Sequence, residues 1–246
     1  MELSPREALE KAYKLLTPYS NKQQWEFDNE LSQVEFIAER FKKNTKILDA
    51  GCGIGLLGVS LALMGYKVEG ADKYVFHEHS QKEIADLRKV WDQVGFRVTD
   101  ADLLFAPATD KYDLVTSIAV IEHQRYPKKF IESLLRSVNE KGSVYIATPN
   151  VLNGLNRFRV LFGKAPMGNV KQFFLEGDAF YGHWREYALA ELVQMCELSG
   201  LKITEASAIQ TSKPRYKKAW YRGVFQLISK YIPGWGDTIR VLAQKN

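Results

Sequence analysis

The chain has 246 residues, of which 46% are apolar and 26% charged, so its composition is that of a folded globular protein and excludes a disordered or fibrous one. The net charge of +5 arises within residues 213–236, which hold six basic residues and no acid, so it does not indicate a surface built for nucleic acid. A polar start, the lack of an apolar run of about 18 residues and two isolated cysteines predict a cytoplasmic protein without signal peptide, membrane span or disulfide.

Apolar periodicity predicts alternating helices and strands along most of the chain. Helices are expected over 2–16 and about 28–42. Strands follow at 46–50, 66–71, 96–99, 112–117 and 142–147, with helices between them over about 54–64, 80–94 and 127–138. Later come a helix with an apolar stripe at Leu189, Leu192 and Cys196, a strand at 201–209 and a last strand at 238–243.

This alternation predicts a parallel sheet with helices on both faces. We expect a single domain over 1–246, in which 1–44 form an N-terminal helical extension. Residues 151–187 interrupt the rhythm with five glycines and many aromatics, which favours a cap inserted over the strand ends. A basic aromatic segment, 212–236, separates the last two strands.

Residues 47–55, with the sequence ILDAGCGIG, are the most informative stretch. They read as a buried strand that breaks into a glycine turn before a helix, an arrangement that brings the backbone close to a nucleotide-like cofactor. A dinucleotide fingerprint would place a third glycine where Leu56 stands, so the fit to NAD is partial. Asp72, at the end of the second strand, can accept hydrogen bonds from the ribose of any such cofactor.

The joint pattern resembles that of class I S-adenosylmethionine-dependent methyltransferases. Residues 49–55 look like the first motif of that family, and the order continues with Asp72, with 102–103 after the third strand and with 112–123 around the fourth. The resemblance covers about residues 28–209 and the final strand. It implies a Rossmann-like, doubly wound, seven-stranded, mostly parallel sheet with an antiparallel last strand, with S-adenosylmethionine as methyl donor and S-adenosylhomocysteine as product.

The same resemblance implies roles for individual residues along the cofactor. The turn Gly51, Cys52 and Gly53 should lie against its methionine part, with Asp49 near the amino group. Asp72 should hold the ribose hydroxyls. Asp102 should accept from the adenine amino group, with Leu103 packing on the ring and Asp100 as the alternative reader. Ser117 and Ile118 should run beneath the cofactor, close to the sulfonium.

A hydroxyl acceptor benefits from a general base, and histidine suits that task near neutral pH. His123 follows the fourth strand, beside the expected methyl position. His183 and Arg185 lie in the block 183–187, which looks like a signature of methyltransferases related to ubiquinone and polysaccharide biosynthesis. The alternatives are an architectural role for His123 and a salt-bridged hinge for His183 and Arg185. No metal is predicted, because His77 and His79 do not share a helix face.

We therefore expect O-methylation of a small-molecule, sugar or lipid-linked acceptor. The alternatives are an NAD(P)-dependent oxidoreductase and a non-catalytic partner protein that keeps the cofactor fold. Residues 213–236 predict either an interfacial helix on an anionic membrane or an ordinary helix with a solvated basic face. Tyr19 and Trp25 are candidate edges of a lid, nucleic acid is not expected as a partner, and the oligomeric state is left open.

Overall fold

A computed structural model describes residues 2–19, 24–73, 75–102, 110–166, 170–211, 232 and 234–245. The expectations for Leu103, for the side chain of Trp25 and for most of 212–236 lie outside these described residues.

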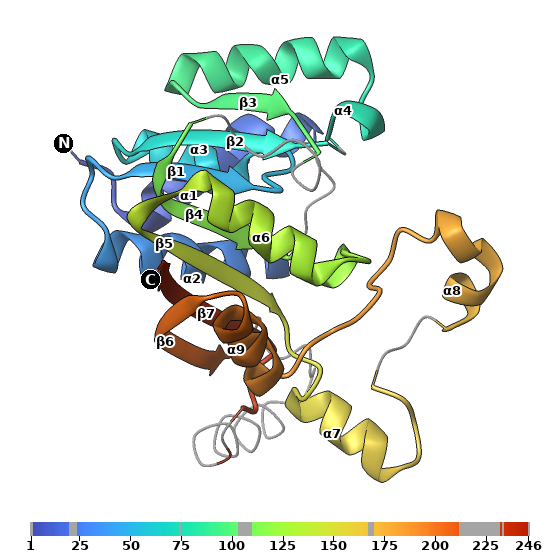
Figure 1. Cartoon of the computed structure of the whole chain (residues 1–246). Coiled ribbons are helices and arrows are strands. Elements are labelled where there is room, and N and C mark those ends of the chain that lie inside the picture. The colour runs from blue at the N-terminus through green and yellow to red at the C-terminus, as the bar shows by residue number, and fades with distance from the viewer. Residues whose placement is uncertain are drawn as a thin grey trace, which may run out of the picture.

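A central seven-stranded sheet organises the molecule, in the order β3-β2-β1-β4-β5-β7-β6 (Figure 1). The predicted mostly parallel sheet is confirmed: β7 runs antiparallel to β5 and β6, and the remaining pairs are parallel. The strands are β1 (Lys46–Ala50), β2 (Lys67–Asp72), β3 (Arg97–Asp100), β4 (Tyr112–Ile118), β5 (Val138–Pro149), β6 (Leu201–Ile209) and β7 (Thr238–Lys245).

Helices cover both faces of this sheet. The main ones are α1 (Pro5–Leu16), α2 (Gln24–Arg40), α3 (Leu56–Leu63), α5 (Gln81–Val94), α6 (Pro127–Ser137) and α9 (Leu189–Leu198). Successive strand residues point to opposite faces, so Ile47 packs in the core with α1, α2, α3 and α5, whereas Leu48 packs in the core with α6 and α9. Shorter elements are α4 (Val75–Glu78), α7 (Gly154–Leu161), α8 (Val170–Glu176) and the 3-10 turns η1 (Thr17–Tyr19), η2 (Ile121–His123) and η3 (Gly177–Ala179).

The fifth strand begins earlier than the sequence predicts. It starts at Val138, directly after α6, instead of at 142. Val138 pairs with Tyr112 of β4, and the register shifts before Leu114 pairs with Ser143. The extra strand residues are therefore held by a pairing distant in sequence, which local periodicity does not show.

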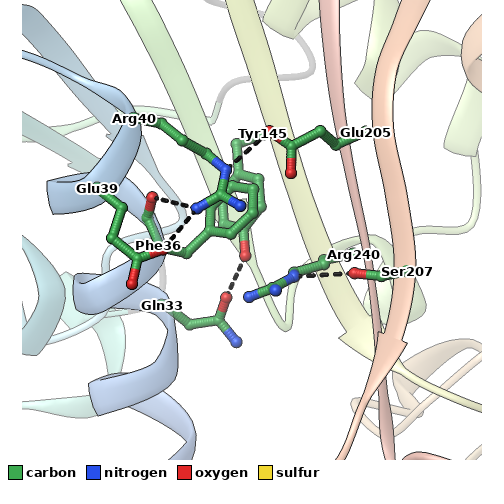
Figure 2. A network of polar contacts seen from close by, with 8 residues as sticks. All are labelled: Gln33, Phe36, Glu39, Arg40, Tyr145, Glu205, Ser207 and Arg240. Atoms are coloured by element: carbon green, nitrogen blue, oxygen red, sulfur yellow. Dashed lines mark hydrogen bonds and ion pairs between the residues drawn. The ribbon is translucent and has the colours of Figure 1, made fainter.

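Helix α2 is fastened to the sheet by stacked and charged side chains (Figure 2). Phe36 of α2 stacks on Tyr145 of β5, with ring centroids 4.7 Å apart. The guanidinium groups of Arg40 and Arg240 lie 3.8 and 4.2 Å from the centroid of the Phe36 ring. Arg40 also donates to Glu205 of β6 at 2.8 Å. This contact ties the N-terminal helices to the far end of the sheet.

The insertion after β5 contains α7 and α8, which extend away from the sheet (Figure 1). Helix α7 rests on Trp235: the Phe158 ring meets the indole edge-on with centroids 5.9 Å apart, and a Cβ added to Gly154 would lie 2.2 Å from it. Within the described residues, no helix combines the length and apolarity needed to cross a bilayer.

Candidate active site

The glycine turn joins β1 to α3 at the carboxyl end of the sheet. Gly51, Gly53 and Gly55 all have positive φ, of 82°, 53° and 88°. A Cβ on Gly51 would come within 2.4 Å of a Val120 methyl carbon, so a side chain there is excluded by contact as well as by conformation. Gly53 has no described atom within 4 Å of its virtual Cβ, so its backbone is open to a ligand.

Asp72 closes this turn from the neighbouring strand. It is 8% exposed, and its carboxylate accepts from the Gly53 N–H at 2.8 Å and the Val75 N–H at 2.9 Å. A carboxylate has about four acceptor positions. These two bonds thus orient Asp72 and leave it able to accept from a pair of hydroxyls.

Two further acids flank the turn. Asp49 is buried at the end of β1 and lies 3.2 Å from the Thr116 hydroxyl. Asp102 follows β3 and forms an ion pair with Lys73, at 3.1 Å.

The glycine turn and the acids Asp72 and Asp102 open into one cavity of about 250 Å³. Its far wall comes from the loop after β4, with His123, and from the cap, with Tyr181. The lining comprises Gly51, Gly53, Ile54, Ala71, Asp72, Lys73, Val75, Glu78, His79, Ala101, Asp102, Ala119, Val120, His123, Gln124, Phe130 and Tyr181. Five residues predicted from sequence thus meet around one space.

His123 is held in a defined tautomer. Its Nδ1 lies 3.2 Å from the Gly182 carbonyl oxygen, which can only accept, so Nδ1 carries the proton and Nε2 is the acceptor of the neutral ring. Burial and the neighbouring His183 lower the pKa of His123. His123 is therefore neutral at pH 7 and equipped to take a proton.

His183 stands edge-on to His123, with ring centroids 4.8 Å apart. Its Nδ1 bonds to Glu186 at 2.8 Å, and this bond raises the pKa of His183, with the charge of Glu122 adding to the effect. The two histidines therefore differ in proton affinity, because one faces a carbonyl and the other a carboxylate.

Glu122 is a site residue for which the sequence predicted no role. It is 1% exposed, and its Oε2 accepts from the Thr148 hydroxyl at 2.8 Å. Its Oε1 has no hydrogen-bond partner among the described residues. Burial raises the pKa of Glu122 to about 7. The only signal in the sequence is its position next to His123.

Glu122, His123 and His183 also form a set able to ligate a cation. One ligand atom of each lies within 4.8 Å of the others. Three protein ligands are the number found in catalytic zinc sites. The cluster is therefore competent for a divalent ion as well as for proton transfer.

Other predicted residues lie elsewhere. As far as the chain is described, the cavity lining does not include Cys52, Ser117, Ile118, His183 or Arg185. Cys52 points to β2, where a Cβ on Gly70 would come within 2.7 Å of its sulfur; burial raises the pKa of the Cys52 thiol. Ser117 is fully buried in β4 and Ile118 packs against the core. Arg185 donates to Glu191 at 2.6 Å, on α9.

The sheet order, the glycine turn and the acid at the end of β2 define an α/β protein that binds a nucleotide-like cofactor at the carboxyl ends of its strands. A family model described as a methyltransferase domain matches residues 24–206. The chain belongs to this family of methyltransferase domains, which confirms the resemblance found in the sequence and removes the support for an NAD(P)-dependent oxidoreductase.

Curated relatives are named ubiquinone biosynthesis O-methyltransferases. The protein of Pseudomonas putida is 31% identical over 121 residues, which are 48% of this chain and 50% of the relative. The mitochondrial protein of Arabidopsis thaliana is 35% identical over 105 residues, or 43% of this chain and 32% of that protein. The chain thus spans about half the length of the Pseudomonas putida relative and about a third of the Arabidopsis thaliana relative.

Solved structures share the fold over almost the whole chain. Magnesium protoporphyrin IX methyltransferase of Synechocystis PCC 6803, with bound S-adenosylhomocysteine, has a TM-score of 0.59 at 16% identity and covers 96% of this chain and 94% of its own. An S-adenosylmethionine-dependent methyltransferase of Mesorhizobium loti has a TM-score of 0.58 at 15% identity, over 87% of this chain and 98% of its own. At these identities, the likeness establishes the fold.

Proposed function

We propose that this protein transfers a methyl group from S-adenosylmethionine to a hydroxyl oxygen of a small-molecule acceptor. The observation that carries the proposal is the single cavity shared by the glycine turn, Asp72 and Asp102 on one side and by His123 on the other. In this proposal residues 1–246 act as one domain.

The residues present fit this cofactor. Gly53 leaves free the space that a Cβ would fill, which allows a ligand to approach the backbone. Asp72 is already oriented by two N–H groups and keeps acceptor positions for a ribose diol. Asp102 lies in the same cavity and is the proposed reader of the adenine amino group. Leu103 stays a predicted partner of the ring, and Asp49, Cys52, Ser117 and Ile118 stay predicted supports of the cofactor.

The bound cofactor would supply an electrophilic methyl carbon, whose bond to sulfur breaks as the bond to the acceptor oxygen forms. His123 takes the hydroxyl proton at Nε2, because its Nδ1 is already committed to the Gly182 carbonyl. A general base of this kind contributes about 10²–10⁴-fold in rate. His183 acts on His123 through its charge, and Arg185 holds the cap to α9.

The acceptor class rests on the relatives, whose names specify O-methylation in ubiquinone biosynthesis. Within this class, we propose that the acceptor is a sugar or is linked to a lipid. A membrane contact through 213–236 belongs to the proposal as well, supported by the six basic residues of that segment, and a cytoplasmic location stays a prediction.

Calorimetry with S-adenosylhomocysteine and with NAD, each titrated separately, tests the cofactor. We expect binding of the homocysteine product and none of NAD; micromolar binding of NAD without a response to S-adenosylhomocysteine would overturn the proposal. A screen of phenolic and sugar hydroxyl acceptors then tests turnover. Product binding without transfer to any acceptor would favour the non-catalytic alternative.

A further inference from the structure

The cap carries an apolar surface that no described element covers. We define the cap face by six side chains of α7, α8 and the residues beside them, each between 52% and 82% exposed: Leu155, Leu161, Phe162, Val170, Phe174 and Leu175. Several exposed large apolar side chains within one segment of a folded protein indicate a place of interaction. The neighbouring Phe158 and Phe173 are excluded from this set because they pack on Trp235 and on Phe180.

The charges around the cap face are mostly positive. Residues 154–175 contain Arg157, Arg159, Lys164 and Lys171 and no acid, and the acids Glu176 and Asp178 follow directly. Two copies of this chain meeting through the cap face would bring these cations together, which is unfavourable. The occupant of the cap face should therefore be anionic as well as apolar.

We propose that the cap face rests on an anionic lipid bilayer. Amphipathic helices with basic residues beside Phe and Leu lie in the interface of such membranes, with the apolar side chains below the headgroups. Each Lys or Arg near an anionic surface strengthens the attraction to that surface. In the cap, α7 and α8 both extend away from the sheet (Figure 1).

The cap face is joined to the cavity by a short stretch of chain. Tyr181 lines the cavity and Gly182 orients His123, only a few residues after α8 ends at Glu176. A bilayer under the cap face would therefore lie near the acceptor side of the cavity. This last step rests on the proposed function, and it favours an acceptor delivered from the membrane.

Co-sedimentation with phosphatidylglycerol vesicles, against phosphatidylcholine vesicles, tests the proposal. We expect binding to the anionic vesicles alone, weaker at high salt. The double variant Phe162→Ser/Phe174→Ser should bind at least about tenfold less, because each Phe loses apolar contact with the lipid. The double variant Lys164→Gln/Lys171→Gln should bind less at low salt and depend less on salt.

The matched control is Leu198→Ser, since Leu198 is 81% exposed but lies on α9, outside the cap. It should bind vesicles as the unchanged protein does. Equal binding to both vesicle types, or an equal loss in the control, would overturn the proposal. So would a dimer in analytical ultracentrifugation that the Phe double variant abolishes, without vesicle binding. Titration with S-adenosylhomocysteine separates the two proposals, because cap-face variants should leave that affinity unchanged.

Discussion

At the scale of residues, the pair His123 and His183 sets the expected pH dependence. His123 must be unprotonated to accept a proton, and burial and His183 lower its pKa. We expect the transfer rate to rise with pH along a limb centred below about 6.5, the ordinary histidine value. His183→Gln removes a positive neighbour and should move that limb to higher pH. His123→Ala should lower the rate by about 10²–10⁴-fold at unchanged affinity for S-adenosylhomocysteine.

Rate profiles between about pH 5 and pH 9 check both variants. An acid limb that stays in place in His183→Gln would contradict the coupling between the rings. Full activity of His123→Ala would remove it as the base and leave the fold assignment intact.

Glu122 predicts how stability changes with pH. Its pKa in the folded protein is about 7, above the ordinary 4.5, so the folded state keeps a proton that the unfolded state has lost between these values. The contribution of Glu122 to stability is therefore fully present below pH 4.5 and is lost as pH rises towards 7. Thermal unfolding across this window should show a smaller fall for Glu122→Gln. His183, whose pKa is raised from 6.5, adds a further loss of stability only above pH 6.5. Stability that rises with pH in the unchanged protein would contradict the assignment.

The ligand geometry of Glu122, His123 and His183 makes a chelator experiment informative. If His123 acts as a base through its own Nε2, treatment with EDTA should leave the rate unchanged. If EDTA abolished activity and one divalent ion restored it, these three residues would be ligands of a metal ion and His123 would not be the general base.

At the scale of elements, the glycine turn depends on its contact with the loop after β4. Gly51→Ala should destabilise the fold by about 1–3 kcal/mol, because φ is +82° and the new Cβ would meet Val120 at 2.4 Å. Gly65→Ala is the matched control, since its φ is +90° but nothing described lies within 4 Å. Adding Val120→Ala to Gly51→Ala should recover only the contact part. Urea unfolding measures all of these variants; equal losses at 51 and 65 would exclude the contact.

A buried hydrogen bond joins α2 to β5, and removing one partner should cost more stability than removing both. The Tyr145 hydroxyl donates to the Gln33 side chain, and both residues are fully buried. Tyr145→Phe should cost about 1–3 kcal/mol, since it leaves a buried acceptor unpaired. Tyr145→Phe combined with Gln33→Leu should cost less than Tyr145→Phe alone. A double variant that is less stable than the single one would show that the bond is not the main contribution.

The local pattern of apolar residues and glycines was enough to predict the strand, turn and helix of residues 47–63. The place of Asp72 beside that turn followed from topology, because the carboxyl ends of adjacent parallel strands meet at one edge of the sheet. The sequence did not predict Glu122, whose Oε2 accepts from the Thr148 hydroxyl and whose backbone carbonyl accepts from the Trp184 N–H at 2.8 Å. It also left open where Arg185 would point. That choice is made by Glu191 on a later helix, a contact that periodicity does not encode.

At the scale of the whole molecule, the cap protrudes from the side of the sheet formed by β5, β7 and β6, where side-chain contacts hold both α2 and α7. The α2 contacts to Tyr145 and Glu205 secure the N-terminal side, whereas α7 rests on Trp235 just before the last strand. The start of the cap is therefore packed against a residue next to the sheet. This arrangement allows its outer surface to change with little cost to the core.

The inner surface of the cap is less free to change, because the Trp184 N–H donates to the Glu122 carbonyl of the loop after β4. Exchanging the cap for that of a relative, in order to change the acceptor, would also exchange the partners of Glu122 and the Gly182 carbonyl that fixes His123. A chimaera with its junctions inside 151–187 should then retain the donor site but misplace the base. A change of acceptor through the cap would therefore also require matching changes in the loop after β4, because the two segments hold each other in place.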